Sequence, residues 1–352
     1  MVDIESFRIL ASTEECKVSL EVQGSVRVDL LGGTLDLIPI NLILPNVVTL
    51  NVATSLKAKV KITEIDFDGV EIVSKDYNST SRFNSSEFTA ENFKNNHFGN
   101  LTFIATLLDL FSLHKKIRLE LESGSPPGAG LGGSSAMGVT CFKAFSEYTN
   151  KKLDRIEAIT KVNGIEAVII DCPAGYQDYY PALFGGVLGL VPKPGSVAVD
   201  QLYSDGLKNY LEQNLTLVYS GETRLSGINN WEVYKAFFNK DQAVRNGLSK
   251  IAELSHQAYQ AIKENKFEQL SKLIANEGEE RRKLFPGILT PLMNEIRNDL
   301  VSMGEGFGIK VCGAGGGGCF LMIHPAGKKA EMRKLINKYN MHELPFVVEK
   351  PL

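Results

Sequence analysis

The segment 125–136, with the sequence SPPGAGLGGSSA, holds the residue types in this chain that are best suited to chemistry. It lies between an alternating apolar run, 117–121, which predicts a strand, and a helical pattern that begins at Met137. Glycines let a backbone approach a bulky ligand, and the first amides of a helix are unpaired donors at the positive end of its dipole. Ser134 and Ser135 add hydroxyls that can cap the helix, contact a phosphate or bind Mg²⁺. The segment, here called the glycine loop, therefore predicts a phosphate-binding site.

Two other kinds of phosphate-binding loop share part of this pattern. A P-loop needs a lysine after its last glycine, and the glycine loop has none there. Gly128, Gly130 and Gly133 fit the G-x-G-x-x-G pattern of dinucleotide-binding proteins, and Asp154 follows at about the twenty-residue spacing of a ribose-binding acid. A second match in 313–318 enters a strand, so the pattern is not specific in this chain. A dinucleotide-binding oxidoreductase stays a distant alternative.

Residue by residue, PPGAGLGGSSA resembles the second motif of the GHMP kinases, the superfamily of galactokinase, homoserine kinase, mevalonate kinase and phosphomevalonate kinase. The segment 24–37, GSVRVDLLGGTLDL, resembles the first, substrate-side motif, and 310–319, KVCGAGGGGC, resembles the third. The resemblance implies an α+β fold of two domains. The first has a mixed sheet with helices, like domain 2 of ribosomal protein S5, and the second is ferredoxin-like. It also implies a small-molecule kinase that uses ATP and Mg²⁺.

Phosphoryl transfer requires an acceptor hydroxyl in line with the terminal phosphate, neutralised phosphate oxygens and a group that takes the hydroxyl proton. By resemblance, Asp178 in the sequence GYQD is the base and Arg27 in the first motif is the cation beside it. Mg²⁺ would be held by Ser135 and Glu166, although Asn163 and Gly164 interrupt the predicted helix and leave a plain helix-end charge as the alternative for Glu166. The residues expected to hold ATP are Pro127, Gly128, Ala129, Gly130, Leu131, Gly132, Gly133, Ser134 and Ser135.

The acceptor side resembles the D-glycero-D-manno-heptose 7-phosphate kinases in three places: a Gly-Gly-Thr-x-Asp sequence, Gln-Asp followed by Phe-Gly-Gly, and Thr-Arg-x-Ser. Leu35 separates the threonine from the aspartate, so another hexose or its phosphate is an alternative acceptor. We expect phosphorylation of a sugar or sugar phosphate at the anomeric carbon. A mevalonate-type alcohol kinase and a catalytically silent sensor of sugar and nucleotide are the other candidates. The expected acceptor residues are Gly33, Thr34, Asp36, Gln177, Arg224, Gly315 and Gly316.

Composition limits the other function classes. The chain has 352 residues, of which 43% are hydrophobic and 22% charged, and its net charge is −3. A balance of this kind provides no general attraction to nucleic acid or to an acidic membrane surface. No apolar run has the length of a membrane span and the start lacks the order of a signal peptide, so we expect a cytoplasmic protein, monomeric or homodimeric. The five cysteines include no C-x-x-C pair, which favours free thiols over a disulfide framework or a zinc site.

Alternation and helical spacing predict the elements that must position these residues. Strands are expected over 17–31, 47–65 and 70–75, an irregular connection over 78–95, and helices over 101–113, 137–148 and 153–162. Helical patterns over 231–263, 266–284 and 290–303 precede a last strand at 345–349. The expected domains are 1–194, with the glycine loop, and 195–352.

Overall fold

Two long antiparallel strands, β1 (Ser19–Leu31) and β2 (Thr49–Glu64), form the centre of the larger sheet. The computed structural model describes residues 19–222 and 228–352. The alternation of Val26, Val28 and Leu30 along β1 puts three fully buried side chains on the core face, which is why this segment forms a strand. The polar residues between them, including Arg27, are buried as well, because other segments cover the opposite face.

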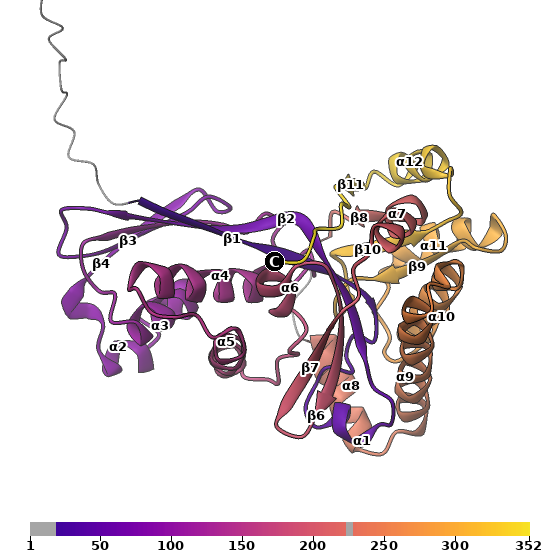
Figure 1. Cartoon of the computed structure of the whole chain (residues 1–352), viewed down its shortest axis with the longest axis horizontal. Coiled ribbons are helices and arrows are strands. Elements are labelled where there is room, and N and C mark those ends of the chain that lie inside the picture. The colour runs from indigo at the N-terminus through magenta and orange to yellow at the C-terminus, as the bar shows by residue number, and fades with distance from the viewer. Residues whose placement is uncertain (1–18, 223–227) are drawn as a thin grey trace, which may run out of the picture.

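The larger sheet has seven strands in the order β4-β3-β5-β2-β6-β7, with β1 paired to β2. Its pairs are antiparallel except for β3 with β5, so the sheet is mixed. Helices cover one face (Figure 1), and α4 begins at Gly133, within the glycine loop. The elements of this unit are α1 (Ile40–Ile43), β3 (Gly69–Ser74), β4 (Ser79–Asn84), α2 (Ala90–Lys94), α3 (Thr102–Leu110), β5 (Ile117–Glu122), α4 (Gly133–Tyr148), α5 (Arg155–Ile169), α6 (Tyr180–Phe184), β6 (Val187–Lys193) and β7 (Ser196–Gln201).

The smaller sheet is antiparallel, with strands in the order β11-β8-β10-β9. Numbered from its own first strand this is the order 4-1-3-2, that of ferredoxin-like sheets. The mixed sheet and this second sheet confirm the predicted α+β class. Its elements are α7 (Asp205–Asn214), β8 (Leu215–Tyr219), α8 (Ile228–Phe238), α9 (Gln242–Lys263), α10 (Leu270–Lys283), α11 (Pro291–Ser302), β9 (Gly308–Val311), β10 (Cys319–Ile323), α12 (Lys329–Lys338) and β11 (His342–Leu344).

The boundary predicted at 194/195 falls in the turn of the β6–β7 hairpin, both strands of which belong to the larger sheet. The chain also returns to that sheet after β11. Ser55 donates its N–H to the carbonyl of Val347, Glu349 donates to Ala53, and Leu352 donates to Phe184. The division into two domains at residue 194 therefore stays a prediction, and residues 347–352 pack with the first unit.

Several predicted elements differ from the observed ones. The irregular connection predicted over 78–95 contains β4, a 3₁₀ turn at Ser85–Glu87 and α2. The single helix predicted over 231–263 is two helices, because Asp241 accepts hydrogen bonds from the amides of Ala243 and Val244 and starts α9 afresh. In place of the strand predicted at 345–349, β11 lies a few residues earlier and an isolated bridge joins Thr54 to Val348.

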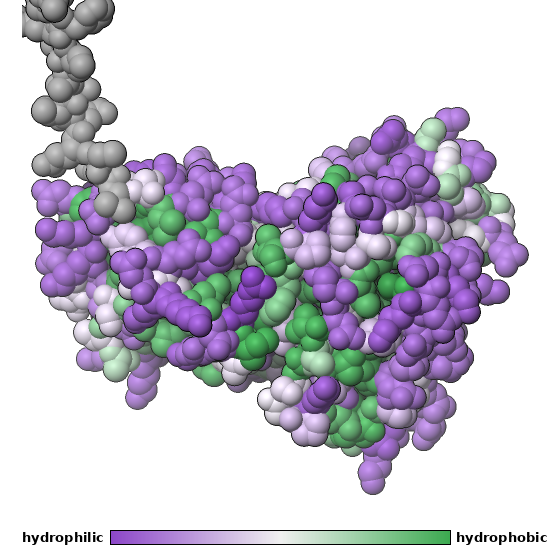
Figure 2. Space-filling model, in the orientation of Figure 1, coloured by the Kyte–Doolittle hydropathy of each residue, from purple (hydrophilic) through white to green (hydrophobic). Residues whose placement is uncertain are grey.

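Most of the visible surface is hydrophilic, with apolar surface gathered at the lower middle of the molecule (Figure 2). The segment around α1 exposes Ile38, Leu42 and Ile43. Within the described residues, no helix combines the length and the apolar character needed to cross a bilayer. Cys141, Cys172, Cys312 and Cys319 form no disulfide; Cys16 lies outside the described residues.

Candidate active site

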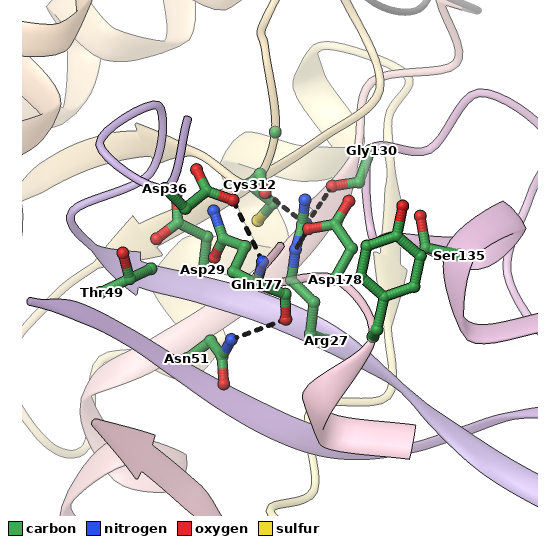
Figure 3. A network of polar contacts seen from close by, with 12 residues as sticks. Arg27, Asp29, Asp36, Thr49, Asn51, Gly130, Ser135, Gln177, Asp178 and Cys312 are labelled. Atoms are coloured by element: carbon green, nitrogen blue, oxygen red, sulfur yellow. Dashed lines mark hydrogen bonds and ion pairs between the residues drawn. The ribbon is translucent and has the colours of Figure 1, made fainter. Parts of the chain in front are cut away.

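The buried Arg27 and the partly exposed Asp178 form an ion pair between β1 and the segment that precedes α6 (Figure 3). The Nε atom of Arg27 lies 2.8 Å from Oδ1 of Asp178, and Nη1 donates to the carbonyl oxygens of Gly130 and Cys312. The guanidinium, which belongs to the first motif-like segment, thus contacts the second and the third at once. Burial lowers the pKa of Arg27, but the carboxylates of Asp178 and Asp29 outweigh burial and raise it above its ordinary value.

The glycine loop comes directly against Asp178. A Cβ atom at Gly132 would lie 3.0 Å from the Cβ of Asp178, and Gly132 has a φ of 70°, so this position requires glycine. The backbone N–H of Arg27 donates to the carbonyl of Leu131, which fixes the loop to β1. Helix α4 begins at the next residue without a side-chain cap, so its first amides remain available to an anion. The loop mouth therefore places an anion-binding helix start beside the Arg27–Asp178 pair.

The third glycine run packs onto the outside of the glycine loop. Cys319 donates its N–H to the carbonyl of Ala129, and a Cβ atom at Gly318 would lie 2.7 Å from the same oxygen. Gly315 and Gly316, predicted to contact substrate, lie instead against Ile288, whose carbonyl accepts the N–H of Gly316. The part of this run that contacts the glycine loop is therefore its end, Gly318 and Cys319.

Glu166 and Ser135 meet on the other side of the loop. Ser135 Oγ and the hydroxyl of Tyr179 each donate to Oε2 of Glu166 over 2.7 Å. Helix α5 continues through Asn163 and Gly164 to Ile169, so the expected break in the helix was wrong and Glu166 lies on its inward side. Burial raises the pKa of Glu166, against the hydrogen bonds from Tyr179 and Ser135. A half-buried carboxylate next to a serine hydroxyl supplies the hard oxygen ligands that suit Mg²⁺. Among the described residues, no group of three or more His, Cys, Asp or Glu side chains forms a metal cluster.

Asp36 and Gln177, both predicted to bind the acceptor, lie close to Asp178. The N–H of Gln177 donates to Oδ2 of Asp36 over 3.1 Å, and both side chains are buried. Burial, and next the charge of Asp178, raise the pKa of Asp36 to about 6. Thr34 has a φ of 70°, unusual for a β-branched residue, and its hydroxyl donates to Asn230 of α8. Side chains that can bind hydroxyl groups thus collect beside the ion pair.

Four charged residues near the site were missed from the sequence: Asp29, Glu277, Arg281 and Lys310. Lys310 Nζ lies 2.9 Å from Asp29 Oδ2 and 3.5 Å from Glu277 Oε2, and all three side chains are buried. Arg281 donates to the carbonyl of Gly313. The sequence does contain a signal for this pairing. Lys310 stands between Ile309 and Val311 in a buried strand, where a charge is tolerated only if it is paired.

Two residues considered from the sequence do not join this site. Arg224, predicted to bind the acceptor, lies outside the described residues. Asp154, the ribose acid of the dinucleotide alternative, caps α5 by accepting hydrogen bonds from the amides of Ile156 and Glu157. Its carboxylate is occupied by the first amides of α5, which removes the main support for a dinucleotide-binding protein.

Comparisons with known proteins give a consistent picture. The family model for the GHMP kinases N terminal domain matches residues 98–186, and that for GHMP kinases C terminal matches residues 258–340. A mevalonate kinase of Saccharolobus solfataricus is 28% identical over 246 residues, which are 68% of this chain and 71% of the relative. A D-glycero-alpha-D-manno-heptose 7-phosphate kinase of Campylobacter jejuni is 30% identical over 170 residues, 48% of this chain and 49% of the relative. The crystal structure of the Methanococcus jannaschii mevalonate kinase superposes with a TM-score of 0.72 at 22% identity, covering 96% of this chain and 100% of that structure.

Proposed function

Because the chain belongs to the GHMP kinases, which transfer phosphate from ATP to an alcohol group, we propose that its acceptor is a sugar or sugar phosphate and that the hydroxyl phosphorylated is on the anomeric carbon. The observation that carries the phosphoryl-transfer part of the proposal is the Arg27–Asp178 pair at the mouth of the glycine loop. It joins an anion-binding helix start, a fixed cation and a carboxylate in one place, as phosphoryl transfer requires.

In the proposed mechanism, the amides of the glycine loop and of the start of α4 bind the phosphates of ATP. Arg27 binds Oδ1 of Asp178, so Oδ2 is the atom assigned to take the proton of the acceptor hydroxyl. As that proton leaves, the hydroxyl oxygen bonds to the γ-phosphorus of ATP, and ADP is the leaving group. Ser135 and Glu166 would hold Mg²⁺, which supplies charge neutralisation at the phosphate oxygens.

The acceptor side supports a polyhydroxylated substrate. Gln177 Oε1 and Asn51 Oδ1 are buried oxygens without a hydrogen-bond partner in the described part of the chain, and Asp36 offers a carboxylate next to them. All three accept hydrogen bonds, so they suit a molecule with several hydroxyl donors. The sequence similarity to a heptose phosphate kinase points the same way.

A mevalonate-type alcohol is the second candidate acceptor. The archaeal mevalonate kinase covers more of this chain than the heptose phosphate kinase does. In addition, Nε and Nη1 of the buried Arg281 have no hydrogen-bond partner among the described residues, and such donors suit an acceptor with an anionic group. A catalytically silent sensor is disfavoured, because Arg27, Ser135 and Asp178 together serve no evident purpose without turnover.

ADP release measured with ATP, Mg²⁺ and a panel of sugars, sugar phosphates and mevalonate tests the proposal. We expect turnover with a sugar or sugar phosphate, and a ³¹P NMR signal coupled to the anomeric proton of the product. Turnover with mevalonate alone would favour the second candidate. Nucleotide binding without turnover of any acceptor would favour the sensor.

A further inference from the structure

Arg27 has two carboxylates within its reach but binds only one of them. Arg27 and Asp29 are two residues apart on β1, so their side chains lie on the same face of the strand. Both are almost fully buried, with 3% and 1% of their surface exposed. Even so, Nε of Arg27 pairs with Asp178, which comes from a segment 151 residues further along the chain. Something must keep Asp29, the carboxylate nearer in sequence, from the guanidinium.

Lys310 occupies that carboxylate. Its Nζ lies 2.9 Å from Oδ2 of Asp29 and 3.5 Å from Glu277 Oε2, and its side chain is 0% exposed. The result is a series of alternating charges, Glu277, Lys310, Asp29, Arg27 and Asp178, which runs from α10 through β9 and β1 to the segment before α6. All but Asp178 are buried. The members of this series come from both sheets, so the second unit contributes a charge directly behind the site.

We propose that Lys310 is a positioning residue: by pairing with Asp29 it prevents Asp29 from capturing Arg27, and so leaves the guanidinium to Asp178. A buried carboxylate that loses its cation takes the nearest remaining one, because an unpaired charge inside a protein is very costly. A Cβ atom at Gly33 would lie 2.1 Å from Asp29 Oδ2 and 2.9 Å from Arg281 Nη1, so two cations remain near Asp29: Arg27, on the same face of β1, and Arg281. Glu277 also loses Lys310 and draws on the charge of Arg281, which leaves Arg27 to Asp29. Lys310 therefore selects which carboxylate the site arginine binds.

The crystal structure of a Lys310→Met variant tests the positioning role without any assay. We expect Arg27 to turn toward Asp29 and its contact with Asp178 Oδ1 to open. The kinetic part of the inference rests on the proposed function: kcat falls about 100-fold, the cost of a displacement of about 1 Å in a reacting group, while KM for ATP changes little.

The double variant Asp29→Asn/Lys310→Met separates positioning from a purely structural role. It removes both the competing carboxylate and its cation. The carboxylate of Glu277 remains compensated by the positive charge of Arg281, one turn further along α10. We expect Arg27 to return to Asp178 and kcat to recover most of its loss. Arg297→Met is the matched control, since it breaks the 2.6 Å pair of Arg297 with Glu279 of α10 away from the site and should leave kcat unchanged.

The inference is overturned if Arg27 stays on Asp178 in the Lys310→Met structure, or if the folded double variant is no more active than Lys310→Met. If Lys310→Met does not fold, the double variant alone tests the proposal. A double variant that folds but is nearly inactive contradicts it. Failure of the proposed function is a different result: Asp178→Ala would retain turnover, while the crystallographic position of Arg27 would still report on Lys310.

Discussion

Cys319 donates its backbone N–H to the carbonyl oxygen of Ala129 over 2.6 Å, so the third glycine run supports the glycine loop from outside. Gly318 makes this approach possible, because its Cα faces the same oxygen where a side chain would not fit. The nucleotide side of the proposed site is therefore built by two segments almost two hundred residues apart, and its shape depends on how they pack.

Gly318→Ala should weaken ATP binding. The new Cβ would lie 2.7 Å from Ala129 O at a φ of 75°, so the loop must shift. We expect Kd for ATP, measured by calorimetry, to rise about tenfold, equivalent to about 1.4 kcal/mol. Gly327→Ala is the control, because it has a similar φ of 84° with nothing within 4 Å of the added atom. Equal effects of the two changes would mean that backbone strain, not loop contact, is responsible.

Asp178→Asn should remove turnover and spare nucleotide binding. The amide retains the size of the side chain but cannot take the acceptor proton, so kcat is expected to fall by a factor of about 10² to 10⁴. Steady-state kinetics and ATP calorimetry on the same preparation check both halves. Asp109→Asn, at an exposed carboxylate of α3, serves as the control. An unchanged kcat for Asp178→Asn would remove Asp178 from the mechanism.

Glu166→Gln should raise the Mg²⁺ requirement. The change keeps an oxygen near Ser135 but removes the charge that would bind the ion. We expect the Mg²⁺ concentration for half-maximal activity to rise about 10- to 100-fold, as is usual when a metal site loses a supporting group. Glu157→Gln, near the start of α5 and exposed, should leave the titration unchanged. Identical titrations for the two variants would place the ion elsewhere.

Asp36→Asn should stabilise the protein at neutral pH while impairing acceptor binding. Folding raises the pKa of Asp36 from 3.8 to about 6, so the folded protein binds this proton more tightly than the unfolded chain does. Stability contributed by protonation is present below pH 3.8 and is lost as the pH rises through 6. The neutral asparagine avoids a cost of about 3 kcal/mol at pH 7.5, and the gain disappears near pH 3.5.

Denaturant unfolding at the two pH values measures this difference, with Asp66→Asn in an exposed turn as the control. KM for the acceptor should rise in Asp36→Asn at every pH at which the wild type is active. A loss of stability at pH 7.5 would mean that the hydrogen bond from the N–H of Gln177 outweighs the cost of burying the charge.

The sequence predicted the parts of the site that depend on local pattern. Strands and helices with regular alternation or spacing, such as β2 and α4, follow from periodicity, and the glycine loop follows from its composition. The continuation of α5 through Gly164 was missed because a glycine lowers the propensity of a segment to form a helix. Here the burial of Val162 and the hydrogen bonds that Glu166 accepts from Ser135 and Tyr179 override that effect. The Lys310–Asp29 pair was missed because it joins residues 281 positions apart, and single-residue patterns carry no information on such a pairing.

The return of residues 347–352 to the first sheet constrains the order in which the two units can finish folding. On the ribosome, the hydrogen-bonding groups of Ala53 and Ser55 emerge early, yet their partners Val347 and Glu349 emerge almost three hundred residues later. Until residues 347–349 have been synthesised, the backbone groups of Ala53 and Ser55 on this side of β2 have no partner. Another extended strand can pair with them during that time. Folding of the first unit is thus completed only after the second has been made, which links the maturation of one to the other.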